Sequence, residues 1–130
     1  MSTSKHSIPL DSARLLTSTY RKNKKKVLRD EYHNKAVLPD CETFDREPFD
    51  KLLARTDCVG VRFYYGMDEE MNVRLVFVGV DENGADILPQ PAPAGMTLMA
   101  ASTTNDDPEV YEEGVRCPPE CPTESTLNQD

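Results

Sequence analysis

Two stretches in the middle of the chain are rich in β-branched and aromatic residues, Cys58–Gly66 and Val73–Val80. This composition is typical of strands. Because the polar connection between them, residues 67–72, is short, the strands should pair as an antiparallel hairpin. We expect the face of each strand that lacks arginine to pack against helices. On the first strand this face carries Val59, Val61, Phe63 and Tyr65, and on the second Val73, Leu75 and Phe77.

A turn and a third short strand are predicted after the hairpin. Residues Asp81–Gly84 have the composition of a turn in which glycine supplies a positive φ. Residues 85–88 can then return as a third strand. The prediction for this part of the chain is therefore an antiparallel β-meander of two to three strands.

A short helix is predicted over residues 46–55. Asp45 is a suitable N-cap, whose carboxylate would accept an N–H of the first turn. Phe44 and Phe49 have the spacing of a hydrophobic staple. A helix this short needs packing to be stable. Its apolar stripe consists of Phe49, Leu52 and Leu53.

Apolar residues also recur at three- and four-residue steps near the N-terminus, where a helix is predicted to begin near Pro9. The bases of residues 21–26 should fall at or beyond its C-terminus, where cations complement free carbonyls. We expect residues 1–7 to be disordered and residues 27–43 to form a connection with one helical turn. The stripe of this helix consists of Leu10, Ala13, Leu16, Thr17 and Tyr20.

The composition changes at Pro89. From Pro89 onward the chain holds seven of its ten prolines and eight acids, against the single base Arg116. Proline lacks the N–H that a sheet needs and like charges repel, so regular structure is not expected there. The apolar residues 96–101 could dock on the sheet. We therefore predict one small α+β domain over residues 8–88, a meander packed by two helices, with a Pro-rich acidic tail over 89–130 that is partly disordered or docked.

Length and charge narrow the class of protein. The chain has 130 residues and a net charge of −8, and residues 1–40 hold nine of its 15 bases but only four of its 23 acids. A negative balance argues against general nucleic-acid binding and against a basic membrane-surface protein. No apolar run approaches the roughly 18 residues of a spanning helix, and the N-terminus lacks the apolar region of a secretory signal. The expectation is a soluble, cytoplasmic protein.

Several segments together resemble a group of small uncharacterised bacterial proteins, over roughly residues 8–121. The resemblance implies a shared layout of an N-terminal helix, a helix-plus-hairpin core and a Cys-Pro-Pro-x-Cys tail. It carries over no catalytic residues. The lysine-rich residues 22–26 are more basic than this group would suggest. The segments are Tyr20-Arg21, Phe44–Leu53, Cys58–Gly66, Leu75–Asp81 and Cys117–Cys121.

The four cysteines are the strongest candidates for chemistry. Cys41, Cys58, Cys117 and Cys121 could form a tetrahedral zinc site or two disulfides. The spacing of Cys117 and Cys121 is wider than the usual zinc knuckle, and Pro118-Pro119 lack the N–H groups of such a knuckle. We therefore expect no bound zinc or other cofactor. A redox pair of Cys117 and Cys121 is the alternative. The simplest expectation leaves Cys58 as a buried strand residue and Cys41 as a loop thiol.

Other constellations favour structural roles. A dyad of His33 with Cys41 or Cys58 lacks any local motif. Residues 81–86 suggest a calcium loop, but aligned on Gly84 two key ligand positions fail, which favours a turn. The bases of residues 21–26 are expected to be a solvated helix end, neutralised in part by the acidic tail, with no specific nucleic acid bound.

The sequence thus predicts a non-catalytic protein-interaction or accessory module with a protein partner, and leaves its oligomeric state open. The short core without catalytic constellations and the Pro-rich tail motivate this prediction. The alternative is a thiol-based metal or redox site that uses the Cys117-Pro-Pro-Glu-Cys121 tail.

Overall fold

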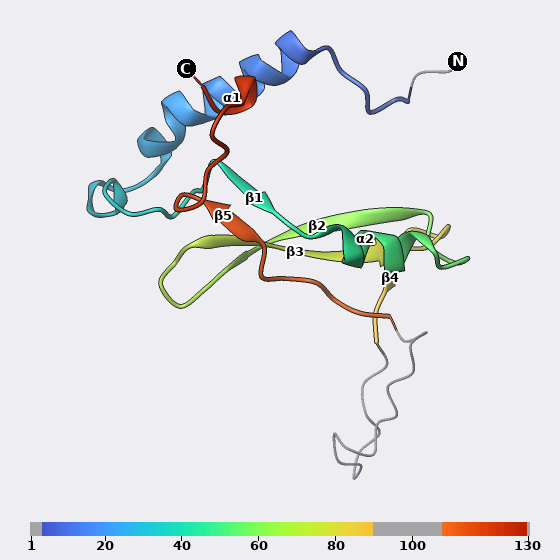
Figure 1. Ribbon diagram of the computed structural model, residues 1–130. Helices are drawn as coiled ribbons and strands as arrows, with labels where there is room; N and C mark the ends of the chain where they lie inside the picture. Colours follow the sequence, from blue (N-terminus) through green and yellow to red (C-terminus); the bar gives the residue numbers. More distant parts are fainter. Residues whose placement is uncertain (1–3, 90–107, 130) are drawn as a thin grey trace. The chain divides into compact units, whose positions relative to one another are not determined.

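The computed structural model describes residues 4–89 and 108–129 of the chain (Figure 1). Residues 1–3 of the segment expected to be disordered, 1–7, lie outside this range. All of residues 96–101, which were expected to dock on the sheet, also lie outside it. The fold is a small α+β fold, as predicted, and it contains two antiparallel sheets, of which the sequence predicted one. The described residues divide into two compact units. Unit 1 comprises residues 4–43, 68–73 and 115–129, and unit 2 comprises residues 44–67, 74–89 and 108–114.

Unit 2 is built on the predicted meander. Strands β2 (Gly60–Met67), β3 (Val73–Val80) and β4 (Asp86–Ile87) lie in the order β2-β3-β4, and the first residue of β3 falls in unit 1. Gly84, in the turn before β4, has a φ of 81°. Residues with a side chain rarely adopt that left-handed conformation, so glycine is favoured there. The hairpin, the turn and the third strand are confirmed.

The core of unit 2 is an aromatic cluster around Phe77 of β3, which has 0% exposure. Helix α2 (Arg46–Leu53) packs on this face of the sheet. On β3 the predicted face therefore packs against a helix. On the first strand the prediction is wrong for Val59 and Tyr65, which are 68% and 84% exposed, because the helix covers the sheet around Phe77 and leaves this part of the edge strand open. The rings around Phe77 belong to Phe49 at 4.7 Å between centroids, Phe44 at 4.8 Å, Tyr111 at 5.1 Å and Phe63 at 5.4 Å.

The start of α2 differs in one respect from the prediction. Asp45 is the N-cap residue, but its side chain makes no capping hydrogen bond. The residue is exposed, so water can solvate its carboxylate in place of the backbone N–H. The helix also ends at Leu53 rather than at residue 55.

Unit 1 contains helix α1 (Leu10–Asn23), which begins after Pro9 as predicted. None of its residues is buried, and Leu16 of the predicted stripe is 66% exposed. The Tyr20 hydroxyl donates to the Pro39 carbonyl at 2.7 Å. Burial, followed by the nearby Asp40 carboxylate, raises the pKa of Tyr20. Three 3₁₀ helices complete the helical parts of unit 1: η1 (Lys24–Val27), η2 (Asp30–Tyr32) and η3 (Thr126–Asn128).

A second sheet in unit 1 corrects two expectations. Strand β1 (Cys41–Thr43) lies in the segment predicted as a connection, and β5 (Val115–Cys117) lies in the tail predicted to lack regular structure. They pair antiparallel, with Cys41 opposite Cys117. Neither three-residue strand contains proline, so both can form the ladder despite the prolines that follow β5.

Arg116 of β5 joins three separate carbonyl groups of unit 1. Its guanidinium donates from Nε to the Val73 carbonyl at 3.1 Å, and from Nη2 to the carbonyls of Ala36 at 2.6 Å and Val37 at 3.3 Å. The residue is only 9% exposed. Buried carbonyls need donors, so this single base of the tail holds β5 against residues 36–37 and the start of β3.

Candidate functional site

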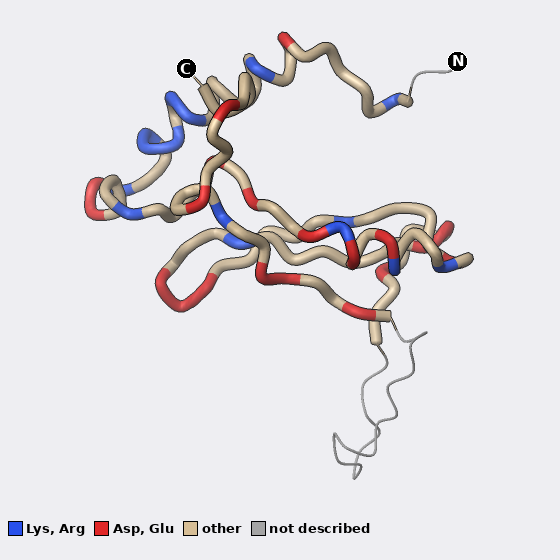
Figure 2. The backbone as a smooth tube through the Cα atoms, in the orientation of Figure 1, with Lys and Arg blue, Asp and Glu red and all other residues tan. Residues whose placement is uncertain are grey.

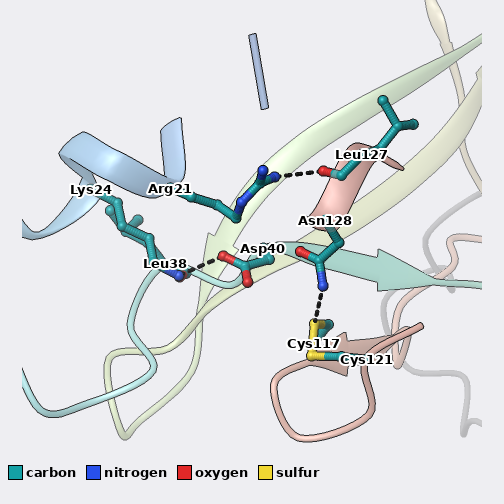
Figure 3. Close-up of a disulfide and its surroundings, with 8 residues drawn as sticks. All are labelled: Arg21, Lys24, Leu38, Asp40, Cys117, Cys121, Leu127 and Asn128. Carbon is teal, nitrogen blue, oxygen red and sulfur yellow. Dashed lines mark hydrogen bonds and ion pairs between the residues drawn. A yellow bond between two sulfur atoms is a disulfide. The ribbon is translucent and has the colours of Figure 1, made fainter. Parts of the chain in front are cut away.

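The principal candidate site is a disulfide between Cys117 and Cys121, at the end of β5 (Figure 3). The peptide bonds before Pro118 and Pro119 are both cis. Cys117 has 0% exposure, whereas Cys121 is exposed. The two sulfur atoms that the sequence singled out are thus joined, and they differ strongly in their access to solvent.

Residues near the C-terminus contact this disulfide from η3. The Asn128 side-chain amide donates to Cys117 Sγ at 3.7 Å. Arg21 of α1 holds the same segment, because its guanidinium donates to the Leu127 carbonyl at 2.5 Å (Figure 3). It also donates to the Gln129 carbonyl at 2.7 Å. Arg21 therefore positions Asn128 beside the sulfur. The sequence indicated Arg21 only as part of the basic segment of residues 21–26, and it contained no local signal for Asn128.

The basic segment of residues 21–26 is thus partly engaged within unit 1. Lys24 Nζ donates to Asp40 Oδ1 at 2.6 Å and to the Leu38 carbonyl at 3.1 Å. Lys22, Lys25 and Lys26 are exposed, and Figure 2 shows these bases gathered along the end of α1 and η1. Arg21 contacts the tail through hydrogen bonds that include those to the Leu127 and Gln129 carbonyls.

Cys41 lies directly opposite Cys117 in the ladder of β1 and β5. Its sulfur is a free thiol and the residue is exposed. Partial burial of the thiol, together with the adjacent Asp40 carboxylate, nevertheless raises the pKa of Cys41. At neutral pH Cys41 is therefore mainly protonated, and its nucleophilic thiolate forms as the pH rises. Three of the four cysteines meet in this part of unit 1.

Cys58 belongs to unit 2. It is half-buried, a free thiol, and its Sγ donates to the Gly60 carbonyl at 3.2 Å. Among residues 4–89 and 108–129, no three His, Cys, Asp or Glu side chains are placed to hold a metal ion. Sulfurs in a disulfide are not thiolate ligands, so a zinc site that uses Cys117 and Cys121, the alternative raised by the sequence, would require the reduced chain.

Two other candidates from the sequence have structural partners. His33 Nε2 is hydrogen-bonded to the Leu28 carbonyl at 3.0 Å, rather than to a cysteine. The Asp81 carboxylate accepts the N–H groups of Asn83 and Ala85 at 2.9 and 3.0 Å. This is the geometry of a side-chain-stabilised turn, as the sequence predicted for this loop.

A second candidate site is the outer edge of β2 in unit 2. β2 is an edge strand of its sheet, because it pairs only with β3. In the described part of the chain, no strand therefore covers its outer edge. Arg62 and Tyr64 both hydrogen-bond the Asp86 carboxylate. The Tyr64 hydroxyl and then the Arg62 guanidinium lower the pKa of Asp86. Large apolar side chains nevertheless remain exposed on and beside β2, namely those of Val59, Phe63, Tyr64, Tyr65 and Met67.

Comparison of the chain with protein-family models, with curated proteins and with solved structures finds no significant match. The resemblance to small bacterial proteins therefore stays a prediction. In the described residues, no helix has the length and apolar character needed to cross a membrane.

Proposed function

We propose that the chain is a non-catalytic protein-interaction module that binds an extended segment of a partner protein along β2. The observation that supports this most directly is the open edge of β2, an eight-residue strand with exposed aromatic side chains. Tyr65 is 84% exposed. Exposed apolar groups on an edge strand are a recurring feature of binding sites.

The physical basis of such binding is addition of a strand to the sheet. An edge strand presents unpaired N–H and C=O groups, and an extended peptide can satisfy them while its alternate side chains pack beside Phe63 and Tyr65. Edge strands are commonly protected from such pairing by lysine, proline or bulges. β2 contains neither lysine nor proline, and its one base, Arg62, is bound to Asp86.

Charge favours a basic partner over a second copy of this chain. Each copy carries a net charge of −8, so two copies repel one another. A segment that alternates apolar residues with Lys or Arg would instead be attracted to the acidic chain and would fit the apolar edge. The proposed partner is therefore a protein with an extended, apolar and basic segment.

Photo-crosslinking tests this proposal. Benzoylphenylalanine in place of Tyr65 should give a defined adduct with one partner protein when the chain is irradiated in extract of its native host. The side chain at this position lies on the proposed contact surface, so the reactive group would face the bound strand. Mass spectrometry of the adduct should locate the link in an extended basic segment of the partner.

The matched control carries benzoylphenylalanine in place of Leu16, which is 66% exposed on α1 in unit 1. We expect no adduct with the same partner from this position. In the otherwise unlabelled protein, Tyr65→Lys should lower the affinity for that partner at least tenfold, because lysine opposes the addition of a strand. Equal adducts from both positions, or none from position 65, would contradict the proposal.

A second candidate function is thiol–disulfide redox chemistry at Cys117 and Cys121. The closed disulfide and the exposure of Cys121 favour it. An exposed disulfide sulfur can be attacked by an external thiol, and such disulfides are generally easier to reduce than buried structural ones. The substrates would then be protein or small-molecule thiols of the compartment in which the chain resides.

Equilibration with glutathione tests this second function. We expect the pair to open and close reversibly with a potential between about −120 and −270 mV, the range of known thiol oxidoreductases. The ratio of closed to open tryptic peptide 117–130 measures it after acid quenching and alkylation. A potential below about −300 mV would assign the disulfide a purely structural role.

A further inference from the structure

Two other cysteines are placed close to Cys117 by the backbone. Cys121 follows four residues later and is bonded to it, and Cys41 is its cross-strand partner in the β1–β5 ladder. The redox function proposed for Cys117 and Cys121 uses only the first of these two cysteines. The position of Cys41 also allows a second disulfide.

We propose that Cys41, Cys117 and Cys121 form one thiol–disulfide exchange site, in which Cys41 takes over the disulfide from Cys121. This inference rests on the second proposed function, because it requires a disulfide that can be exchanged. It adds a resolving thiol and a second covalent state of the protein to that function.

The ladder brings Cys41 and Cys117 to the separation that a disulfide requires. Directly opposite residues in an antiparallel pair have Cα atoms about 4.5–5.5 Å apart. Disulfides form at Cα separations of about 4.4–6.8 Å. Side chains of such a pair also lie on the same face of the sheet. Rotation of the two side chains is therefore sufficient to form a Cys41–Cys117 bond, without displacement of either strand.

The two cysteines of the existing disulfide differ in their exposure to solvent. Cys117 has 0% exposure, so a thiol from solution reaches the exposed Cys121. Cys41 is placed to reach the buried sulfur from the neighbouring strand. A nucleophile held beside its target reacts as if it were at a high local concentration. An external thiol and Cys41 thus attack different sulfur atoms of one disulfide.

The exchange needs no added oxidant or reductant. The Cys41 thiol loses its proton to solvent, and the thiolate attacks Cys117 Sγ. The Cys41–Cys117 bond forms as the Cys117–Cys121 bond breaks, and its electron pair leaves with Cys121 Sγ, which takes up a proton. One disulfide and one thiol are present before and after the step. The products are a disulfide across β1 and β5 and a free, exposed Cys121 thiol.

Asn128 assists the attack from outside. When a solution thiol bonds to Cys121, Cys117 leaves as a thiolate. The hydrogen bond from the Asn128 amide to Cys117 Sγ stabilises that charge. The thiolate then lies beside Cys41, rather than in contact with solvent. Arg21 acts as a positioning residue in this step because it holds η3 through the Leu127 and Gln129 carbonyls.

Peptide mapping distinguishes the two disulfides. Trypsin releases Cys41 in peptide 36–46 and both tail cysteines in peptide 117–130, and cleavage after Glu120 separates Cys117 from Cys121. The resident disulfide therefore appears within peptide 117–130. The exchanged disulfide appears as a link between peptides 36–46 and 117–130.

Two independent measurements use these peptides. In Cys121→Ser, oxidised glutathione should produce the Cys41–Cys117 link as the main product in a monomeric chain. In the wild-type chain, which needs no substitution, the rate at which the exchanged link appears should rise about tenfold per pH unit below the pKa of Cys41, because only the thiolate attacks. Acid quenching with N-ethylmaleimide fixes each state before digestion.

The controls separate this inference from the redox function on which it rests. Cys58→Ser should leave both disulfides unchanged, and Cys41→Ser should abolish the exchanged link while the Cys117–Cys121 pair still responds to glutathione. Separate glutathione adducts on Cys41 and Cys117 in Cys121→Ser, or a link found only between two chains, would overturn the exchange. Failure of the glutathione titration in Cys41→Ser would count against the redox function itself.

Discussion

Replacement of Phe77 by alanine should lower the free energy of unfolding by about 3–5 kcal/mol, the range found for truncation of buried aromatic residues. The Phe77 side chain is fully buried and contacts four aromatic rings that come from three parts of unit 2. Alanine would remove the ring at the centre of this cluster and leave a cavity that the surrounding rings can fill only in part. The measurement is urea denaturation followed by circular dichroism.

The matched control for Phe77→Ala is Leu53→Ala, which truncates an exposed side chain of α2. This control should change the stability by less than about 0.5 kcal/mol. If Phe77→Ala cannot be purified in folded form, Phe49→Ala removes only one of the stacked rings and should show a smaller loss. A loss below about 1 kcal/mol for Phe77→Ala would contradict the central place of this ring.

The arrangement around Phe77 could be predicted from the sequence because its signals are local. Alternation along residues 58–66 and 73–80 defines two faces, and the short connection defines the hairpin. Phe44 and Phe49 lie on either side of a recognisable helix start. The ring contacts of Phe77 with Phe63 and with these two residues confirm the predicted face around Phe77. The prediction fails for Val59 and Tyr65 of the same face, which are exposed.

The pairing of β1 with β5 could not be predicted in the same way. Each strand has three residues, which is too short for alternation to be recognised, and the two lie far apart in the sequence. Prolines and acids near β5 also indicated irregular structure. β5 forms despite these signals because the buried guanidinium of Arg116 stabilises it. The guanidinium donates hydrogen bonds to carbonyls of two distant segments.

In the candidate site, too, the local features could be predicted from the sequence and the tertiary contacts could not. The proximity of Cys117 and Cys121 follows from their spacing alone, so the sequence could suggest a redox pair. The position of Cys41 depends on the register of β1 against β5, and that of Asn128 depends on the contact of Arg21 with η3. Contacts of this kind are set by tertiary structure, which leaves no periodic pattern in the sequence.

Arg116→Met should lower the free energy of unfolding by about 3 kcal/mol. Hydrogen bonds from a charged donor contribute about 1.5–3 kcal/mol each, although their effects do not add in full. Methionine keeps much of the side-chain volume but donates no hydrogen bond. The carbonyls of Ala36, Val37 and Val73 would lose this donor, and Val37 would keep only the hydrogen bond from the Val73 N–H.

Urea denaturation measures this loss, and hydrogen exchange should locate it in the β1–β5 ladder. The control is Arg46→Met, which removes an exposed arginine paired with Asp50 four residues later on α2. Such pairs contribute about 0.3–0.5 kcal/mol, so this control should have little effect.

Since Arg116 precedes Cys117 in β5, Arg116→Met should also expose the buried sulfur. We expect the disulfide to be reduced faster in this variant, in parallel with its lower stability. An unchanged reduction rate would show that the contacts of Arg116 stabilise the β1–β5 ladder without shielding Cys117.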